Sequence, residues 1–336
     1  MKRVLLCGAG KIAGKHVKCI ANIEDAAIAA VCDIRQEAAR AFAENRNLSV
    51  PVYGSIDEAL DNGTYDYCIL STPRRARLAL IEACAKAGVP VLIEKPPCDT
   101  LETGKKAGAV LRDTNLLHSV GFMHRWNESL NHTLDAISGE RKMLVMIQFY
   151  NTFYHQLDRL SEDHFDPFKV SVTGGVVGDQ CIHYLDLCRY ISGCEVKMIQ
   201  TVFAGNQGIP VRSSNTTVDT LTWTLQMENG VIVSHTHTWC APFPRCLVEI
   251  MTDKSSVTVD LFKNKASGMV AGEPFEFQGT ADEYEEEHRG FMRAIEAKDM
   301  SLVRSSYADA LKTFALTEEL LSRVQSARSL DMLIKA

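Results

Sequence analysis

Residues 3–14 read RVLLCGAGKIAG, an apolar run of strand length that passes directly into a glycine-rich turn. The turn has the pattern G-x-G-x-x-A, in which Gly8 permits a tight bend, Gly10 lets the backbone approach a pyrophosphate, and small Ala13 keeps the following helix close to the strand. A helix that begins near Lys11 offers N–H groups and the positive end of its dipole to the phosphates. The stretch therefore predicts a dinucleotide-binding turn whose contacts come from Gly8, Gly10, Lys11, Ile12 and Ala13.

A second apolar run, residues 26–32, ends at Asp33, about 20 residues beyond the turn. At this spacing a carboxylate reaches the ribose hydroxyls of the adenosine. Asp33 favours NAD because a carboxylate repels a 2′-phosphate, whereas Arg35 could pair with that phosphate and allow NADP. A glycine turn without a ligand is the alternative, and Asp33 at this distance argues against it. We assign Ile34, which lies between Asp33 and Arg35, to the cofactor site as well.

A third apolar run, residues 91–97, reads VLIEKPP and ends in a charged pair followed by two prolines. The pattern predicts a buried strand that breaks into a loop at Lys95. Ligands of open α/β sheets bind at the carboxyl ends of strands, where a lysine is a candidate for proton transfer. The alternative is a salt bridge between Glu94 and Lys95 at the rim of the sheet.

The composition restricts the class of protein. A chain of 336 residues is long enough for two domains. The net charge of −6 leaves no broad basic surface for nucleic acid or an anionic membrane. No apolar run approaches a membrane span, and the first residues lead into a strand rather than a signal peptide. The 11 cysteines are scattered without a C-x-x-C pair, which predicts a reduced, cytoplasmic protein without disulfides.

Strand and helix signals alternate up to about residue 121, which predicts right-handed crossovers and a parallel sheet. We expect strands at 3–8, 27–32, 66–71, 89–94 and 116–121, and helices at 12–22, 35–45, 56–61, 75–87 and 100–113. Asp99 and Thr100 are expected to cap the last of these helices.

After Gly121 the strands become longer and alternate between apolar and polar residues, as in LTWTL at 221–225. This alternation predicts an antiparallel sheet with one face toward solvent or a partner. We expect strands at 143–151, 196–204, 216–227, 230–239, 245–252 and 255–262, and helices at 128–138, 282–297 and 304–327. The fold class is therefore α/β, with a parallel sheet in residues 1–121 and a large, mostly antiparallel open sheet in residues 122–336. The last helix could pack back on the first domain.

Residues 174–187 read GGVVGDQCIHYLDL and carry a second group of polar residues. On a helix, Asp179 and His183 are four residues apart and share one face, with Asp186 close by. An imidazole held by a carboxylate is a common general acid/base arrangement. A capping aspartate beside a packed histidine is the alternative.

His235 and His237 lie on one face of a predicted strand, with Cys240 near in sequence. Because no third ligand follows at a suitable spacing, packing within the sheet is favoured over a metal site. We predict no metal.

These motifs extend over essentially the whole chain in a fixed order: Gly8-Ala9-Gly10, Glu94-Lys95-Pro96, Ser119-Val120-Gly121-Phe122 with Arg125 and Asn127, Asp179-x-x-x-His183, and residues 287–291 and 304–311. In this order the chain resembles the glucose–fructose oxidoreductase / inositol dehydrogenase (Gfo/Idh/MocA) family. The resemblance implies an N-terminal Rossmann domain and a C-terminal domain whose open sheet often forms an oligomer interface. It also implies a nicotinamide cofactor, NAD or NADP, between the domains.

The resemblance further implies functional residues. Lys95 matches the catalytic lysine of the family, and Asp179 and His183 match its acid/base pair. In the oxidative direction a base would take the hydroxyl proton while the carbinol hydride passes to the nicotinamide. The implied cofactor site also includes Ser71, Thr72, Pro73, Glu94 and Lys95, and the implied substrate site comprises Lys95, Arg125, Trp126, Tyr154, Asp179 and His183. The aromatic run at 149–155 could line a sugar pocket or pack between domains.

The implied function is that of an NAD(P)-dependent dehydrogenase or reductase acting on a secondary alcohol of a cyclic polyol, sugar or sugar derivative, in a homodimer or homotetramer. Two alternatives stay open. One is an NAD-dependent glycosidase that oxidises its substrate transiently. The other is a non-catalytic cofactor-binding protein, against which the retention of Lys95, Asp179 and His183 argues.

One departure from the family pattern lies in residues 72–77, TPRRAR, where the family often has a histidine at the last position. Arg74, Arg75 and Arg77 could be solvated side chains that reach outward. Alternatively, they could bind an anion such as a phosphate or carboxylate of the cofactor or substrate.

Overall fold

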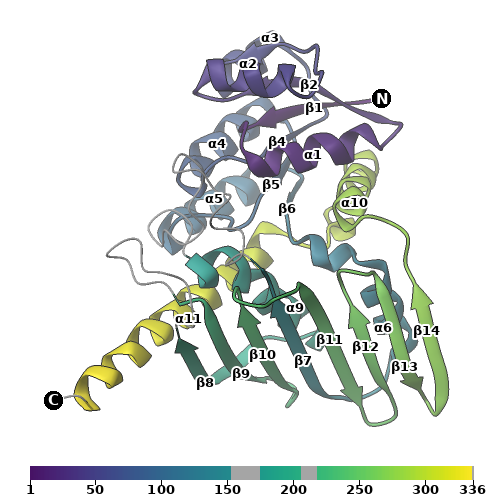
Figure 1. Cartoon of the computed structure of the whole chain (residues 1–336). Coiled ribbons are helices and arrows are strands. Elements are labelled where there is room, and N and C mark those ends of the chain that lie inside the picture. The colour runs from purple at the N-terminus through teal and green to yellow at the C-terminus, as the bar shows by residue number, and fades with distance from the viewer. Residues whose placement is uncertain (153–174, 206–217, 335–336) are drawn as a thin grey trace. The chain divides into compact units, whose positions relative to one another are not determined.

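A computed structural model describes residues 1–152, 175–205 and 218–334 (Figure 1). The chain forms two compact units: one contains Met1–Trp126 and Asp282–Phe314, and the other contains Asn127–Ala281 and Ala315–Ala336. The division expected at residue 121 falls inside the first unit. The first unit also takes in a C-terminal segment, because Phe291 and Met292 of helix α10 (Glu283–Ala297) join its core. The assignment of cofactor and substrate binding to separate domains stays a prediction.

The first unit contains the expected parallel sheet, with the strand order β3-β2-β1-β4-β5-β6. Its strands are β1 (Lys2–Cys7), β2 (Ala26–Cys32), β3 (Val52–Tyr53), β4 (Tyr67–Leu70), β5 (Val91–Ile93) and β6 (His118–Val120). The order reverses at β1 and β4, and ligands of open α/β sheets bind beside the carboxyl ends of strands at such a point. The sequence does not predict β3, since two half-buried residues are too few to produce a periodic pattern.

Helices connect the strands of this sheet. They are α1 (Lys11–Ala21), α2 (Gln36–Glu44), α3 (Ile56–Asn62), α4 (Arg77–Ala87), which follows the 3₁₀ turn η1 (Arg74–Ala76), and α5 (Leu101–Asp113). Thr100 caps α5 as expected: its hydroxyl accepts from the backbone N–H of Thr103, whose side chain in turn accepts from the Thr100 N–H. The short helices η2 (Met123–Trp126) and η5 (Met300–Leu302) complete the helices of this unit, together with the first residues of α11 (Tyr307–Ile334).

The second unit contains the expected mostly antiparallel sheet, with the order β14-β13-β12-β11-β7-β10-β9-β8 (Figure 1). Only the pair β7 and β10 is parallel among these neighbours. The strands are β7 (Lys142–Tyr150), β8 (Val196–Gly205), β9 (Thr220–Met227), β10 (Ile232–Thr238), β11 (Arg245–Thr252), β12 (Ser256–Asp260), β13 (Lys265–Val270) and β14 (Glu273–Gln278). Strands β13 and β14 were not among those expected from the sequence.

One face of this sheet packs against helices. Residues of α6 (Glu128–Ala136), of the π-helical turn η4 (Val177–Cys181), of α9 (Ile182–Ser192) and of the later part of α11 share a core with the inward residues of the strands. The other face carries large apolar side chains at the surface, among them Met198, Phe203, Met251 and Met269. Within the described part of the chain, no helix has both the length and the apolar character needed to cross a membrane.

Candidate functional site

The two glycines of the first turn are required for different reasons. Gly8 has φ +100°, and a Cβ added there would lie 2.8 Å from the backbone of Ser71, so close packing of β1 against β4 excludes a side chain. At Gly10 an added Cβ would meet no atom of the described residues within 4 Å. Packing therefore does not explain Gly10, and the close approach of a ligand to its backbone stays the prediction for this residue.

Helix α1 begins directly after Gly10, and no side chain among the described residues caps its N-terminus. Its first turn also lacks acidic residues, so the positive end of the helix dipole is not neutralised locally. Ala13 is fully buried in the core of the unit, as the pattern predicted, while Lys11 is exposed and Ile12 is half-buried. These features fit a binding place for phosphate groups.

Asp33 lies at the carboxyl end of β2, beside this turn. One oxygen of its carboxylate accepts from the backbone N–H of Ala9 at 2.9 Å, and the other accepts from that of Arg35 at 2.9 Å. The Arg35 side chain pairs loosely with Asp33, with Nε 3.7 Å from Oδ1. Ile34 exposes 90 % of its surface, so an apolar side chain is open to solvent next to the Asp33 carboxylate.

Ser71, Thr72 and Pro73 follow β4. The hydroxyl of Ser71 donates to the carbonyl of Cys7 at 2.8 Å, which ties the ends of β1 and β4 together. Thr72 Oγ1 is buried and has no hydrogen-bond partner among the described residues. A buried hydroxyl without a partner is costly, and a ligand that contacts it would remove that cost.

Lys95 follows β5 and is half-buried. Its backbone is fixed by Glu94, whose Oε2 accepts from the Lys95 N–H at 3.1 Å, while Oε1 lies 3.0 Å from His16 Nε2. Burial alone would raise the pKa of the Glu94 carboxyl. The hydrogen bond from His16 and the charges of His16, Lys95 and Arg77 outweigh burial and hold that pKa below its ordinary value.

Arg77 fixes the same loop from the other side. Its Nη1 donates to the carbonyls of Glu94 and Pro96, and its Nη2 donates to those of Thr72 at 3.0 Å and Lys95 at 3.4 Å. Arg77 is only 4 % exposed, so the interpretation as an outward-reaching side chain is wrong for this residue. Burial lowers the pKa of the guanidinium to about 10, against the opposing charge of Glu94, and the group stays charged at neutral pH.

The anion-binding interpretation does not describe the contacts of Arg77 either, because both of its terminal nitrogens bind backbone carbonyls. Arg75 is exposed and Arg74 is half-buried. The sequence indicated a role for this position only through the resemblance, because the family often has a histidine where this chain has Arg77.

Within the first unit, a chain of buried polar side chains continues from Glu94. His16 Nδ1 lies 3.0 Å from His288 Nε2, and His288 Nδ1 lies 3.1 Å from the Tyr67 hydroxyl. Burial, followed by the proximity of His16, holds the pKa of His288 well below its ordinary value, so this imidazole is neutral at pH 7. No sequence pattern indicates this chain of side chains, because it joins α1 to α10 across more than 270 positions.

Glu287, one residue before His288, is also buried, with 1 % of its surface exposed. Neither carboxyl oxygen has a hydrogen-bond partner among the described residues. Burial raises the pKa of Glu287 well above its ordinary value, and the negative charges of Glu94 and Glu283 add to the effect. A buried carboxyl of this kind is a functional candidate that no sequence pattern indicated.

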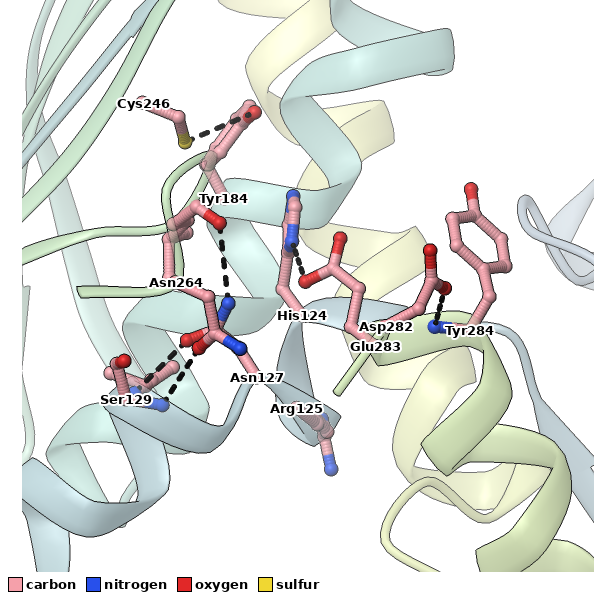
Figure 2. A network of polar contacts seen from close by, with 12 residues as sticks. His124, Arg125, Asn127, Ser129, Tyr184, Cys246, Asn264, Asp282, Glu283 and Tyr284 are labelled. Atoms are coloured by element: carbon pink, nitrogen blue, oxygen red, sulfur yellow. Dashed lines mark hydrogen bonds and ion pairs between the residues drawn. The ribbon is translucent and has the colours of Figure 1, made fainter. Parts of the chain in front are cut away.

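Arg125 and Trp126 lie in η2 and are both buried. Arg125 donates to the Arg304 carbonyl and to Asp309, with Nη2 2.6 Å from Oδ2. A Cβ on Gly290 would overlap the Trp126 ring, which shows how closely α10 packs on it. Figure 2 shows the neighbouring His124 paired with Glu283 at 2.9 Å. These contacts are structural, and a substrate-binding role for Arg125 and Trp126 stays a prediction.

In the second unit, Asp179 lies in the π-helical turn η4 and His183 in the first turn of α9. A plain α-helix was expected here, and the structure has a π-helical turn instead. A π turn at this point still brings residues four apart to the same side, and such turns are frequent at functional sites. Asp179 is half-buried and His183 is 7 % exposed. Tyr154, expected in the substrate site, lies outside the described residues.

Asn127, quoted with the resemblance, caps α6. Its Oδ1 accepts from the Leu130 N–H at 3.0 Å, and its Nδ2 donates to the Leu261 carbonyl (Figure 2). Lys95 belongs to the first unit and the pair Asp179–His183 to the second, so their common action stays a prediction.

Two sequence models of protein families match the chain. The model described as an oxidoreductase family with an NAD-binding Rossmann fold matches residues 2–122, and the GFO/IDH/MocA C-terminal domain matches residues 144–258.

Among curated proteins, the uncharacterised oxidoreductase YrbE of Bacillus subtilis is 26 % identical over 86 % of this chain and 85 % of its own length. An inositol 2-dehydrogenase of Rhizobium meliloti is 29 % identical over 56 % of this chain and 54 % of its own length. The match thus spans about half of that dehydrogenase.

Solved structures of low sequence identity share the fold. A UDP-N-acetylglucosamine 3-dehydrogenase of Acidithiobacillus ferrooxidans is 20 % identical, with a TM-score of 0.81 over 97 % of this chain and 98 % of that one. A levoglucosan dehydrogenase in complex with NADH and levoglucosan is 17 % identical, with a TM-score of 0.83 over 97 % of both chains.

Proposed function

Because the chain belongs to the Gfo/Idh/MocA family of oxidoreductases with an NAD-binding Rossmann fold, we propose that it is an NAD-dependent dehydrogenase or reductase of a cyclic polyol, sugar or sugar derivative. The observation that carries this proposal is the turn around Gly10. There the backbone is open, the N-terminus of α1 has no side-chain cap among the described residues, and Asp33 is held beside it. The names of the relatives, inositol 2-dehydrogenase among them, support the choice of substrate class.

The residues of the first unit fit a dinucleotide. Backbone N–H groups after Gly10 would hold the pyrophosphate, Asp33 the ribose hydroxyls, and exposed Ile34 would cover an apolar ring. Thr72 Oγ1 would gain the partner that it lacks. Two backbone N–H groups hold the Asp33 carboxylate in place. Because its negative charge disfavours a 2′-phosphate, we expect NAD to bind more tightly than NADP.

When bound, the nicotinamide supplies the acceptor or donor of the hydride. We assign to Lys95 the task of polarising the reacting hydroxyl or relaying its proton. The contacts of Glu94 and Arg77 with its backbone support this role, because they hold the loop in one position. We assign to His183 the task of general acid/base, with Asp179 orienting its ring or binding a substrate hydroxyl.

The exposed apolar side chains on the outer face of the large sheet support a homo-oligomer, a dimer or tetramer, that covers this face. All 11 cysteines are free thiols and nine of them are buried, which supports a reducing, cytoplasmic location.

The proposal is tested by following NADH formation with a panel of inositols, sugars, sugar phosphates and nucleotide sugars, in parallel with NADP. Reduction of free NAD by at least one cyclic polyol or sugar is the expected result. Release of an aglycone without accumulation of NADH would instead indicate a glycosidase that recycles its cofactor. Tight NAD binding without turnover of any member of the panel would favour a non-catalytic protein.

A further inference from the structure

Three potential metal ligands meet in the core of the second unit. His235 and His237 lie on the inward face of β10, and Cys181 ends the π-helical turn η4. All three are completely buried, and one ligand atom from each lies within 4.8 Å of the others. The sequence offered only Cys240 as a third ligand, whereas the fold brings Cys181 to the two histidines.

Two of the three distances within this cluster are close to those around a coordinated ion. His235 Nε2 lies 3.3 Å from His237 Nδ1, and Cys181 Sγ lies 3.6 Å from the same nitrogen. Tetrahedral zinc, with its usual bond lengths, separates two nitrogens by about 3.3 Å and a nitrogen from a sulfur by about 3.6 Å. These two distances are therefore close to two edges of a zinc tetrahedron.

The protonation state of His237 is fixed by its neighbours. Trp239 Nε1 can only donate, and it contacts Gln180 Oε1, which identifies that atom as the amide oxygen. The same oxygen lies 3.3 Å from His237 Nε2, so Nε2 must carry the proton. The lone pair of His237 is therefore on Nδ1, the nitrogen that faces Cys181 and His235.

One lone pair cannot satisfy two donors well. Without an ion, the Cys181 thiol and His235 Nε2 both face the single lone pair of His237 Nδ1. An ion at the centre of the three atoms would use every lone pair that points there. The contact of Gln180 with His237 is the kind of second interaction that orients a ligand histidine.

Burial lowers the pKa of His237 to about 3, and burial and the neighbouring His237 lower that of His235 well below its ordinary value. Burial raises the pKa of the Cys181 thiol, so the thiol keeps its proton until a cation displaces it.

We propose that Cys181, His235 and His237 bind one zinc ion through Sγ, Nε2 and Nδ1, with a water as the fourth ligand. On binding, the Cys181 thiol loses its proton to solvent and the two neutral histidines lose none. On α9 and η4, Cys181 is two positions from both Asp179 and His183, which places it on the opposite side of the helix from that pair. The ion would thus fix this helix to the sheet.

The metal content of the purified full-length protein tests the proposal. We expect about one zinc per chain, and its loss in Cys181→Ser and in His235→Phe, in which a ring is kept between Trp223 and Tyr184. Cys188→Ser is the matched control, because Cys188 is an equally buried thiol of α9 outside the cluster. Equal losses in Cys188→Ser and Cys181→Ser would overturn the site.

Titration of the chelator-treated wild type keeps the test independent of how the variants fold. Cobalt(II) should give the thiolate charge-transfer band and the intense visible bands of a tetrahedral site, and zinc should release about one proton per chain and raise the melting temperature. Gln180→Leu should weaken zinc binding by about 10- to 100-fold. Absence of a cobalt–thiolate band, or stoichiometric binding of copper(I) but not zinc, would contradict the proposal.

Discussion

At the scale of single residues, Arg77 makes the most specific prediction about the loop that carries Lys95. Arg77→Leu removes the donors of four backbone carbonyls, and we expect the free energy of unfolding to fall by about 3 kcal/mol. Where the variant is folded, kcat should fall while the Kd for NAD changes little, because Lys95 is displaced. Arg77→His should recover part of kcat, and Arg75→Leu, at an exposed position, should change neither quantity. A loss of stability with full kcat would refute the positioning role.

Glu287 gives a prediction about pH. Its pKa is raised in the folded protein, so ionisation opposes folding once the pH exceeds the ordinary pKa of a glutamate. Glu287→Gln should therefore be about as stable as the wild type at pH 4 and increasingly more stable than it as the pH rises. Chemical unfolding at several pH values measures this difference, with exposed Glu82→Gln as the control. A difference that does not grow with pH would show that Glu287 is not a buried, protonated carboxyl.

At the scale of elements, the two glycines of the first turn are expected to affect different properties, Gly8 the stability of the fold and Gly10 the binding of the cofactor. Gly8→Ala places a Cβ against Ser71 at a positive φ, and we expect it to lower the free energy of unfolding by about 1–3 kcal/mol. Gly10→Ala meets no described atom, so stability should be nearly unchanged while NAD binds more weakly. Thermal melts and NAD titrations of both variants check this. A normal NAD affinity in Gly10→Ala would mean that the cofactor does not approach this turn.

The sequence predicted most of the elements but not all of them. Long apolar or alternating runs correspond to β1, β2, β7 and β9, and the Thr100 cap was identified from its residue type. β3 was missed because two residues give no period. β13 and β14 were missed because Gly268 and Pro274, together with several half-exposed positions, weaken the strand signal.

The candidate site was predictable where function depends on neighbours in sequence, as in the glycine turn and at Glu94-Lys95-Pro96. It was not predictable where function depends on the fold. His16, Glu94, His288 and Tyr67 come from α1, the end of β5, α10 and β4, and only packing joins them. Cys181 likewise meets His237 across 56 positions.

At the scale of the whole molecule, the outer face of the large sheet predicts association. Met198 and Phe203 of β8 are 48 % and 66 % exposed, on a sheet whose other face is already covered by helices. We expect a dimer or tetramer at micromolar concentration, and Phe203→Glu should shift the mass toward the monomer. Sedimentation of the wild type and this variant measures the mass. A monomeric wild type would contradict the assignment of this face.

The central claim is that the chain transfers a hydride between NAD and an alcohol with the help of Lys95. The most direct measurement compares kcat and NAD affinity of Lys95→Ala with those of the wild type, on whichever polyol or sugar supports turnover. We expect kcat to fall by about 10² to 10⁴ while the Kd for NAD stays within a few-fold, since the pyrophosphate and ribose contacts lie elsewhere. Lys105→Ala, at an exposed position of α5, should behave as the wild type. A Lys95→Ala enzyme with kcat close to that of the wild type would contradict the account.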